Sequence, residues 1–126
     1  MSILTGEQRE QFYRDGYLRL GKVLEAEQVE GLRAELDRVI KQEQEREDYS
    51  DLPPEFAFGH DRKGQSKETR SVRAIHQFVN MWKVSPLYEQ VLRNPLITGA
   101  ISELMDDTPL RIWHDQIISK PPGDNA

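Results

Sequence analysis

The sequence predicts an α+β fold in which helices come first and the main strand comes late. Three observations predict it. Capped helix starts recur along the 126 residues, one long segment carries a helical apolar stripe, and a β-rich run lies near the C-terminal end. The expected order is helix, short strand, long helix, irregular segment, two short helices and a final strand.

The first helix has a clear start and a clear end. Thr5 and Gln8 have the spacing of a capping box, in which each side chain bonds a free backbone N–H of the first turn. Gly16 follows Asp15 and can take the left-handed conformation that ends a helix. The run 17–20 then predicts a short strand, because β-formers alternate with a polar position there.

A long helix is expected over 25–46. Apolar residues recur there at three- and four-residue spacing and form one stripe, while charged residues occupy the other faces. The stripe consists of Val29, Leu32, Leu36, Val39 and Ile40. The last turns, 41–48, lack apolar residues, so we expect them to project into solvent.

The middle of the chain is less regular. Prolines and glycines interrupt 49–71 and predict a long loop there. The run 72–82 fits a helix roughly as well as a strand followed by a turn, and both remain open.

Two short helices are expected next, over 87–92 and 96–105. Each is preceded by a residue that can cap a helix and then by a proline, which is favoured at the first helical position. The two pairs are Ser85-Pro86 and Asn94-Pro95.

The final strand is expected over 110–119, which is rich in β-formers, and the prolines that follow should end it. Side chains alternate along a strand, so His114, Gln116, Ile118 and Lys120 should share one face. A lysine beside a glutamine suits an anionic group such as a carboxylate. Spacing alone favours the simpler interpretation, in which Lys120 is solvated at the end of an edge strand.

The histidines do not form an evident metal site. A two-histidine, one-carboxylate site on Fe(II) needs two ligands on the same face of one element. His114 and Asp115 are neighbours, so on a strand they should point to opposite faces. His60 and Asp61 lie in the expected loop, where no further ligand is near in sequence. We therefore assign neither a metal ligand nor a catalytic residue.

Composition excludes several classes of function. The net charge is −5, there is no cysteine, and basic residues do not cluster with aromatic ones. Nucleic-acid binding, disulfides and a cysteine nucleophile are therefore not expected. No apolar run approaches the roughly 20 residues that span a bilayer, and the first residues do not resemble a signal peptide. A cytoplasmic protein without a membrane partner is expected.

Three stretches resemble the phytanoyl-CoA dioxygenase family. The opening 4–18 is similar to the family start, a helix ending in Asp-Gly-Tyr before a strand. The continuation 23–33 resembles the family's first long helix. The closing 113–123, which contains Lys-Pro-Pro-Gly, resembles the strand that precedes the family's metal motif. The resemblance covers nearly the whole chain in order and is loosest over 49–82.

The resemblance implies a double-stranded β-helix, or jelly roll, with a helical layer against one sheet. It also implies an Fe(II)- and 2-oxoglutarate-dependent dioxygenase that hydroxylates a small organic substrate while 2-oxoglutarate becomes succinate and CO₂. The family's His-x-Asp pair follows the Lys-Pro-Pro segment. Residues 1–126 are therefore expected to be the N-terminal portion of one such domain, truncated before its iron ligands and inactive alone.

Only cosubstrate-supporting positions can be carried over from the family. Gln116 matches a strand residue that faces 2-oxoglutarate, and Lys120 matches the lysine of the Lys-Pro segment. Arg73 matches a basic residue that contacts 2-oxoglutarate, with an alignment offset of one residue. His114 is an expected pocket neighbour. The substrate and the oligomeric state stay open.

The alternative function is a non-enzymatic helical interaction module. In that case the amphipathic helix over 25–46 and the short helices pack on their own, and the long loop is the binding surface.

Overall fold

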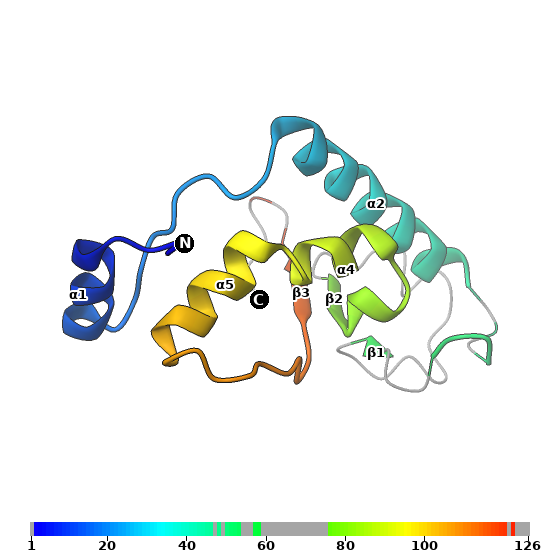
Figure 1. Cartoon of the computed structure of the whole chain (residues 1–126). Helices are drawn as coiled ribbons and strands as arrows, with labels where there is room; N and C mark the ends of the chain where they lie inside the picture. Colours follow the sequence, from blue (N-terminus) through cyan, green and yellow to red (C-terminus); the bar gives the residue numbers. More distant parts are fainter. Residues whose placement is uncertain are drawn as a thin grey trace.

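The computed structural model describes residues 2–46, 48, 50–53, 57–58, 76–120 and 122. Its elements are α1 (Gly6–Asp15), α2 (Ala26–Glu45), β1 (Ala57–Phe58), β2 (His76–Val79), the 3₁₀ helix η1 (Met81–Lys83), α4 (Pro86–Leu92), α5 (Pro95–Leu104) and β3 (Gln116–Ser119). The strands form one antiparallel sheet in the order β1-β2-β3, so the α+β class is confirmed (Figure 1).

The first helix begins and ends as predicted, but no strand follows it. Thr5 Oγ1 accepts from the N–H of Gln8 at 3.2 Å, and Gln8 Oε1 accepts from the N–H of Thr5 at 2.9 Å. Gly16 ends α1 with φ +79°. The predicted strand over 17–20 is wrong: this segment has no regular structure, and Tyr17 is 60% exposed. No described strand lies beside it to complete a ladder, so alternation alone was insufficient.

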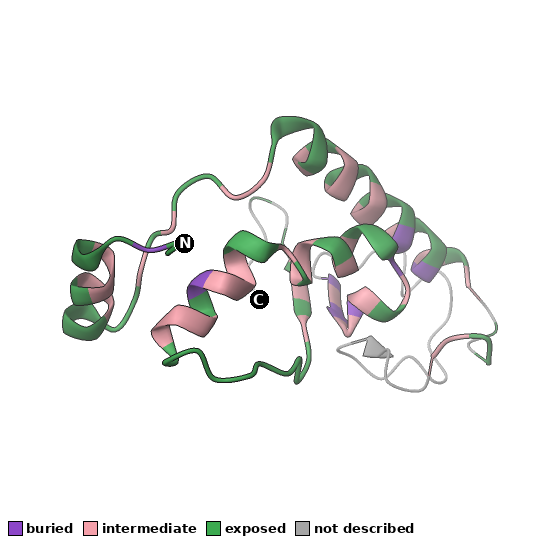
Figure 2. Cartoon of the chain, in the orientation of Figure 1, coloured by how far each residue is buried: buried purple, intermediate pink, exposed green. Residues whose placement is uncertain are grey.

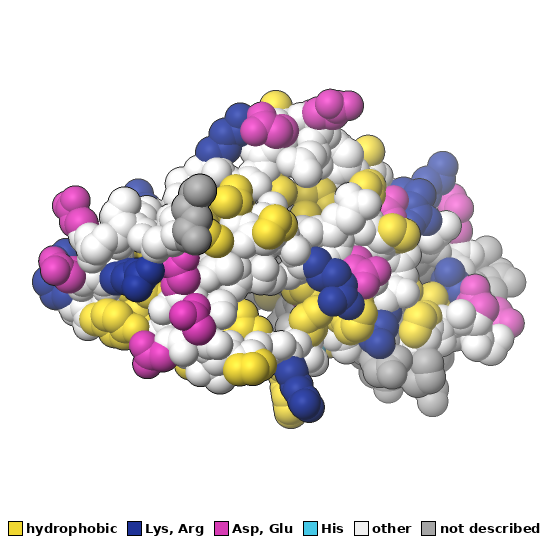
Figure 3. All heavy atoms as spheres, in the orientation of Figure 1, with side chains coloured by type: hydrophobic (Ala, Val, Ile, Leu, Met, Phe, Trp, Pro, Cys, Tyr) yellow, Lys and Arg dark blue, Asp and Glu magenta, His cyan; other side chains and the backbone are white. Residues whose placement is uncertain are grey.

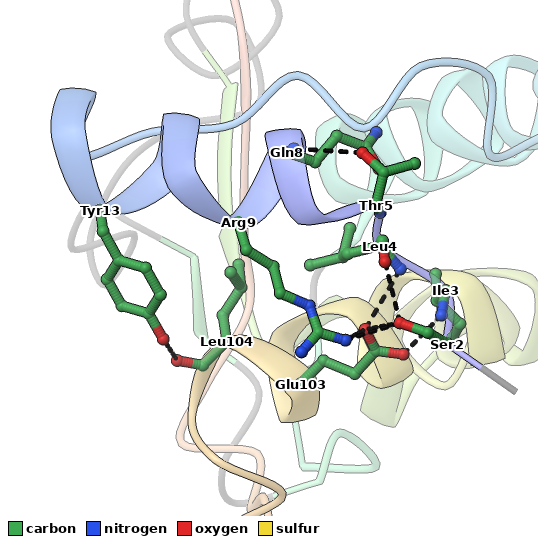
Figure 4. Close-up of polar contacts among 9 residues, drawn as sticks. All are labelled: Ser2, Ile3, Leu4, Thr5, Gln8, Arg9, Tyr13, Glu103 and Leu104. Atoms are coloured by element: carbon green, nitrogen blue, oxygen red, sulfur yellow. Dashed lines mark hydrogen bonds and ion pairs between the residues drawn. The ribbon is translucent and has the colours of Figure 1, made fainter.

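A polar clasp holds the N-terminal arm on α5. Glu103 of α5 accepts hydrogen bonds from the backbone N–H groups of Ile3 and Leu4, from the Ser2 hydroxyl and from the Arg9 guanidinium (Figure 4). The backbone donors are the first cause of a lowered pKa, which is about 2 for Glu103. In Figure 1, a long irregular linker separates α1 from α2, so the clasp fixes the position of α1.

The hydrophobic core lies between α2 and the sheet. Val39, Phe78 and Met81 are buried there. Partly buried apolar residues surround them: Leu36, Ile40, Leu52, Val84, Tyr88 and Ile117. The predicted apolar stripe of α2 therefore faces the core, and Figure 2 shows buried residues gathered where the C-terminal half of α2 passes β2.

The expectation that the last turns of α2 project into solvent is wrong for Glu43. This glutamate is 1% exposed, and its Oε2 lies 3.1 Å from Nδ1 of His76, which is also buried. Strand β2 passes beneath the helix and presents a polar partner at that point. The carboxylate can be buried because its charge has a hydrogen-bonding partner.

The open alternative over 72–82 resolves to a strand followed by a turn. Strand β2 is followed by η1, and Asn80 between them has φ +61°. Residues 72–75 lie outside the described part of the chain. So does most of the predicted loop over 49–71, within which the structure places β1.

The two short helices form as predicted, although only one has the expected side-chain cap. Asn94 Oδ1 accepts from the N–H of Leu96 at 2.9 Å at the start of α5. Ser85 makes no cap hydrogen bond at the start of α4. Its hydroxyl is buried and makes no hydrogen bond with a described residue.

Strand β3 is shorter than the predicted strand over 110–119. Residues 110–115 precede it without strand pairing, and Trp113 is 90% exposed. The reason lies in β2, because the chain turns at Asn80, whose N–H donates to the carbonyl of Asp115 at 2.9 Å. Beyond that bond β2 offers no backbone opposite 110–114, so the ladder stops.

Candidate functional site

The two faces of the sheet differ in what covers them. In the antiparallel register Phe78 lies opposite Ile117, and this pair packs against the helical core. The neighbouring pairs are Val79 with Gln116 and Gln77 with Ile118. Because side chains alternate along a strand, these pairs lie on the opposite face. We call the face that carries Gln77, Val79, Gln116 and Ile118 the open face.

The predicted cosubstrate residues fall at this face where they are described. Gln116 is exposed at the start of β3, and Lys120 is exposed directly after its end. Ile118, between them, is 62% exposed. Arg73 lies outside the described residues. Gln116 thus lies on β3 and Lys120 lies directly after it, four residues further along the chain. Their role in holding a cosubstrate stays a prediction.

These two side chains offer complementary chemistry for a carboxylate. Lys120 makes no ion pair with any other described residue. The Gln116 amide can donate a directional hydrogen bond, and the ammonium supplies a compact positive charge. Together they can hold an anionic group but cannot do redox chemistry.

Asp115 has a structural role that the sequence analysis missed. Burial raises its pKa, and hydrogen bonds from the backbone N–H groups of Trp82 and Met81 oppose that rise. The backbone carbonyl of Asp115 accepts from the N–H of Asn80 at 2.9 Å, so this residue lies beside the start of η1. His114 beside it is exposed. Asp115 lies within the strand predicted over 110–119, and sequence pattern alone does not reveal its contact with Asn80 before η1.

The described residues do not fit an iron site. Among them there is no group of three or more histidine, aspartate or glutamate side chains that could hold a metal ion. Two histidines and a carboxylate are what an Fe(II) oxygenase site uses.

The buried Glu43–His76 pair was also missed, although a signal was present. Glu43 follows Leu36 by seven residues and Val39 by four, so it continues the apolar stripe of α2. Its charge led to the expectation of solvation. A charged residue at a position of the buried stripe indicates a buried hydrogen-bonding partner, which here is His76.

The comparison with family models identifies the class of protein. The model described as phytanoyl-CoA dioxygenase (PhyH) matches residues 12–126. The chain therefore belongs to the phytanoyl-CoA dioxygenase family, for which dioxygenase chemistry with iron and 2-oxoglutarate is the family-level expectation. Neither the curated proteins nor the solved structures gave a match. In the described part of the chain, every helix is too short or too polar to cross a bilayer.

Proposed function

We propose that the chain is the N-terminal portion of an Fe(II)- and 2-oxoglutarate-dependent dioxygenase that hydroxylates a small organic substrate. The family match over 12–126 carries this proposal. The arrangement of the sheet supports it, because helices cover one face and the opposite face presents Gln116 and Lys120. On this proposal the 126 residues alone are inactive.

The fold fits the helical layer and first strands of a jelly roll. A jelly roll has about eight strands, and the described residues form a three-stranded antiparallel sheet. On this proposal the open face becomes the inner wall of the completed fold. The core around Phe78 stays between the sheet and the helices that cover it. Within the described residues β3 pairs only with β2, and its other edge is where the next strand of the domain would pair.

The proposed role of this chain is to hold the cosubstrate. Lys120 and Arg73 provide positive charge for a carboxylate of 2-oxoglutarate, and Gln116 orients it through its amide. The redox chemistry would come from iron and 2-oxoglutarate held by the family's iron ligands, and Gln116, Lys120 and Arg73 would only hold the cosubstrate. The proposal places the His-x-Asp pair and the second histidine after Ala126.

Sequencing the source transcript past Ala126 tests the proposed domain organisation. We expect the reading frame to continue into a histidine–any–aspartate triplet shortly after the Lys-Pro-Pro-Gly segment. A continuation without that triplet would refute the assignment of the iron ligands.

Binding of 2-oxoglutarate to this chain tests the open face. In saturation-transfer NMR we expect signal on the 2-oxoglutarate methylene protons, and about a fivefold weaker signal with Lys120→Gln, as expected for loss of one exposed charge pair. Lys22→Gln removes the same charge from the linker, where Lys22 pairs with Glu25, and should leave the signal unchanged. Equal loss in both variants would show that only net charge matters.

A further inference from the structure

A groove of about 720 Å³ lies between α4, α5 and the extended segment 110–115. Leu92 lines it from α4, Ile101 from α5, and Ile112 from the extended segment. Its volume falls within the roughly 300–1,000 Å³ typical of small-molecule pockets. Neither Gln116 nor Lys120 lines the groove, so it is distinct from the open face described above.

The groove offers an aromatic surface. Trp113 lines it and is 90% exposed, with its ring at 6.4 Å from the His114 ring in an edge-on arrangement. Tyr88 lines the groove from α4. An exposed indole face favours offset stacking with a second flat ring, which adds to the gain from burying apolar surface. An aromatic ligand would therefore use Trp113 better than an aliphatic one.

The groove also carries positive charge. Arg111 lies two residues before Trp113, lines the groove, and makes no ion pair with any other described residue. Arg93, also in the lining, pairs with Glu89 at 2.9 Å. The one acidic residue in the lining, Asp115, forms no ion pair with either arginine. A guanidinium beside an apolar wall is suited to a carboxylate.

The surface view agrees with this arrangement. In Figure 3, hydrophobic side chains lie between Lys and Arg side chains over α4 and along the segment that leads from α5 to β3. The chain as a whole carries a net charge of −5, which repels anions at long range. Recognition of an anion on this face therefore depends on local contacts with Arg111.

We propose that this groove binds a small planar aromatic carboxylate, with its ring stacked on Trp113 and its carboxylate on Arg111. The occupant is a free small molecule, because helices wall two sides of the groove and the third side supplies both the aromatic face and the charge. The proposal does not depend on the dioxygenase assignment, since it uses no residue of the open face.

Titration with 2-naphthoate tests the proposal on the intact 126-residue chain. The chain has two tryptophans, Trp82 and Trp113, so a ¹H–¹⁵N spectrum contains two indole signals, and Trp113→Phe identifies them. We expect 2-naphthoate to shift the Trp113 signal in a saturable manner. Binding should weaken about fivefold with Arg111→Gln, the scale of one exposed charge pair, and remain unchanged with Lys22→Gln.

Matched ligands separate the two parts of the recognition. We expect 2-naphthylmethylammonium, which reverses the charge, and cyclohexanecarboxylate, which lacks the flat ring, each to bind at least fivefold more weakly than 2-naphthoate. Equal binding of the cation would refute the role of Arg111, and equal binding of the aliphatic anion would refute stacking. A Trp113 shift that grows with protein concentration alone would assign the groove to a second copy of the chain and overturn the proposal.

Discussion

Glu43 and His76 join the long helix to the sheet through a contact that excludes water. Both side chains are buried, and the 3.1 Å distance between Oε2 and Nδ1 is that of a hydrogen bond. A buried carboxylate that loses its partner keeps its desolvation cost, so each half of the pair should be much more sensitive to substitution than the exposed ion pairs of α2.

Removing either partner should therefore destabilise the fold strongly. We predict that Glu43→Ala lowers the free energy of unfolding by about 3 kcal/mol or more, measured by urea denaturation. Glu30→Ala removes an exposed glutamate that pairs with Arg33 on the same helix, and should change stability by less than about 0.5 kcal/mol. The double variant with His76→Ala should lose less than the sum of the two single losses. Strict additivity would contradict a direct coupling between these side chains.

Glu103 should make the attachment of α1 dependent on pH. Its pKa is lowered from 4.5 to about 2 in the folded chain, so its contribution is fully present above pH 4.5 and is lost as pH falls through about 2. We predict that amide signals of the N-terminal arm move toward unfolded positions over that range. Glu103→Gln should loosen the arm at neutral pH and remove the transition. Persistence of the transition in this variant would assign it to another group.

At the scale of elements, the helices were predictable and the strands only partly so. The two ends of α1 are set by local interactions, at Thr5 and Gln8 at its start and at Gly16 at its end. In α2 the spacing of the apolar residues indicates which face is buried. Strands depend on partners distant in sequence. Nothing in 17–20 reveals that no described strand lies beside it, and nothing in 110–115 reveals that β2 turns away at Asn80.

The candidate site was predictable to a similar extent. The alternation along β3 placed Gln116 and Ile118 on one face, as the register shows. Two contacts could not be predicted without knowing which segments meet across the fold. They are the hydrogen bond between Asn80 and the Asp115 carbonyl and the pairing of Glu43 with His76. The groove beside Trp113 lies along 110–115, where a strand was predicted and none forms. The sequence pattern therefore did not predict the groove.

Two helical glycines provide a matched test of packing around α2 and α5. A Cβ added at Gly31 would meet nothing within 4 Å, so Gly31→Ala should stabilise the chain by about 1 kcal/mol through helix propensity. A Cβ at Gly99 would lie 2.2 Å from Cδ1 of Ile3. Gly99→Ala should therefore displace Ile3 and gain less.

Urea denaturation measures the change in stability. Hydrogen exchange of the Leu4 amide, which donates to Glu103, measures the displacement of the neighbouring Ile3. We expect faster exchange of the Leu4 amide with Gly99→Ala and no change with Gly31→Ala. Equal stabilisation by the two substitutions, with Leu4 unaffected, would show that Ile3 does not pack on α5.

At the scale of the whole molecule, the sheet is exposed on one face and, within the described residues, unpaired along β3. Exposed strand edges promote association between chains, and a charge on such a strand opposes it. We predict that Ile118→Lys delays the onset of light scattering on warming. Leu96→Lys replaces a similarly exposed apolar residue on α5, at 46% against 62%, and should have a smaller effect. Equal effects would indicate general surface hydrophobicity rather than the strand.

The alternative of an independent helical module makes the opposite prediction for the whole chain. It requires a cooperative melting transition and a well-dispersed NMR spectrum without further polypeptide. The dioxygenase proposal predicts marginal stability, because the described sheet has three strands where a jelly roll has about eight.

On the dioxygenase proposal, these 126 residues support the site of the intact enzyme without supplying its iron ligands. Anaerobic calorimetric titration of the chain with Fe(II) tests that claim directly. We predict only the heat of dilution, because the described residues contain no three-ligand group and the proposal places the ligands after Ala126. Stoichiometric, saturable Fe(II) binding that is lost on substitution of His114 or His60 would contradict the account.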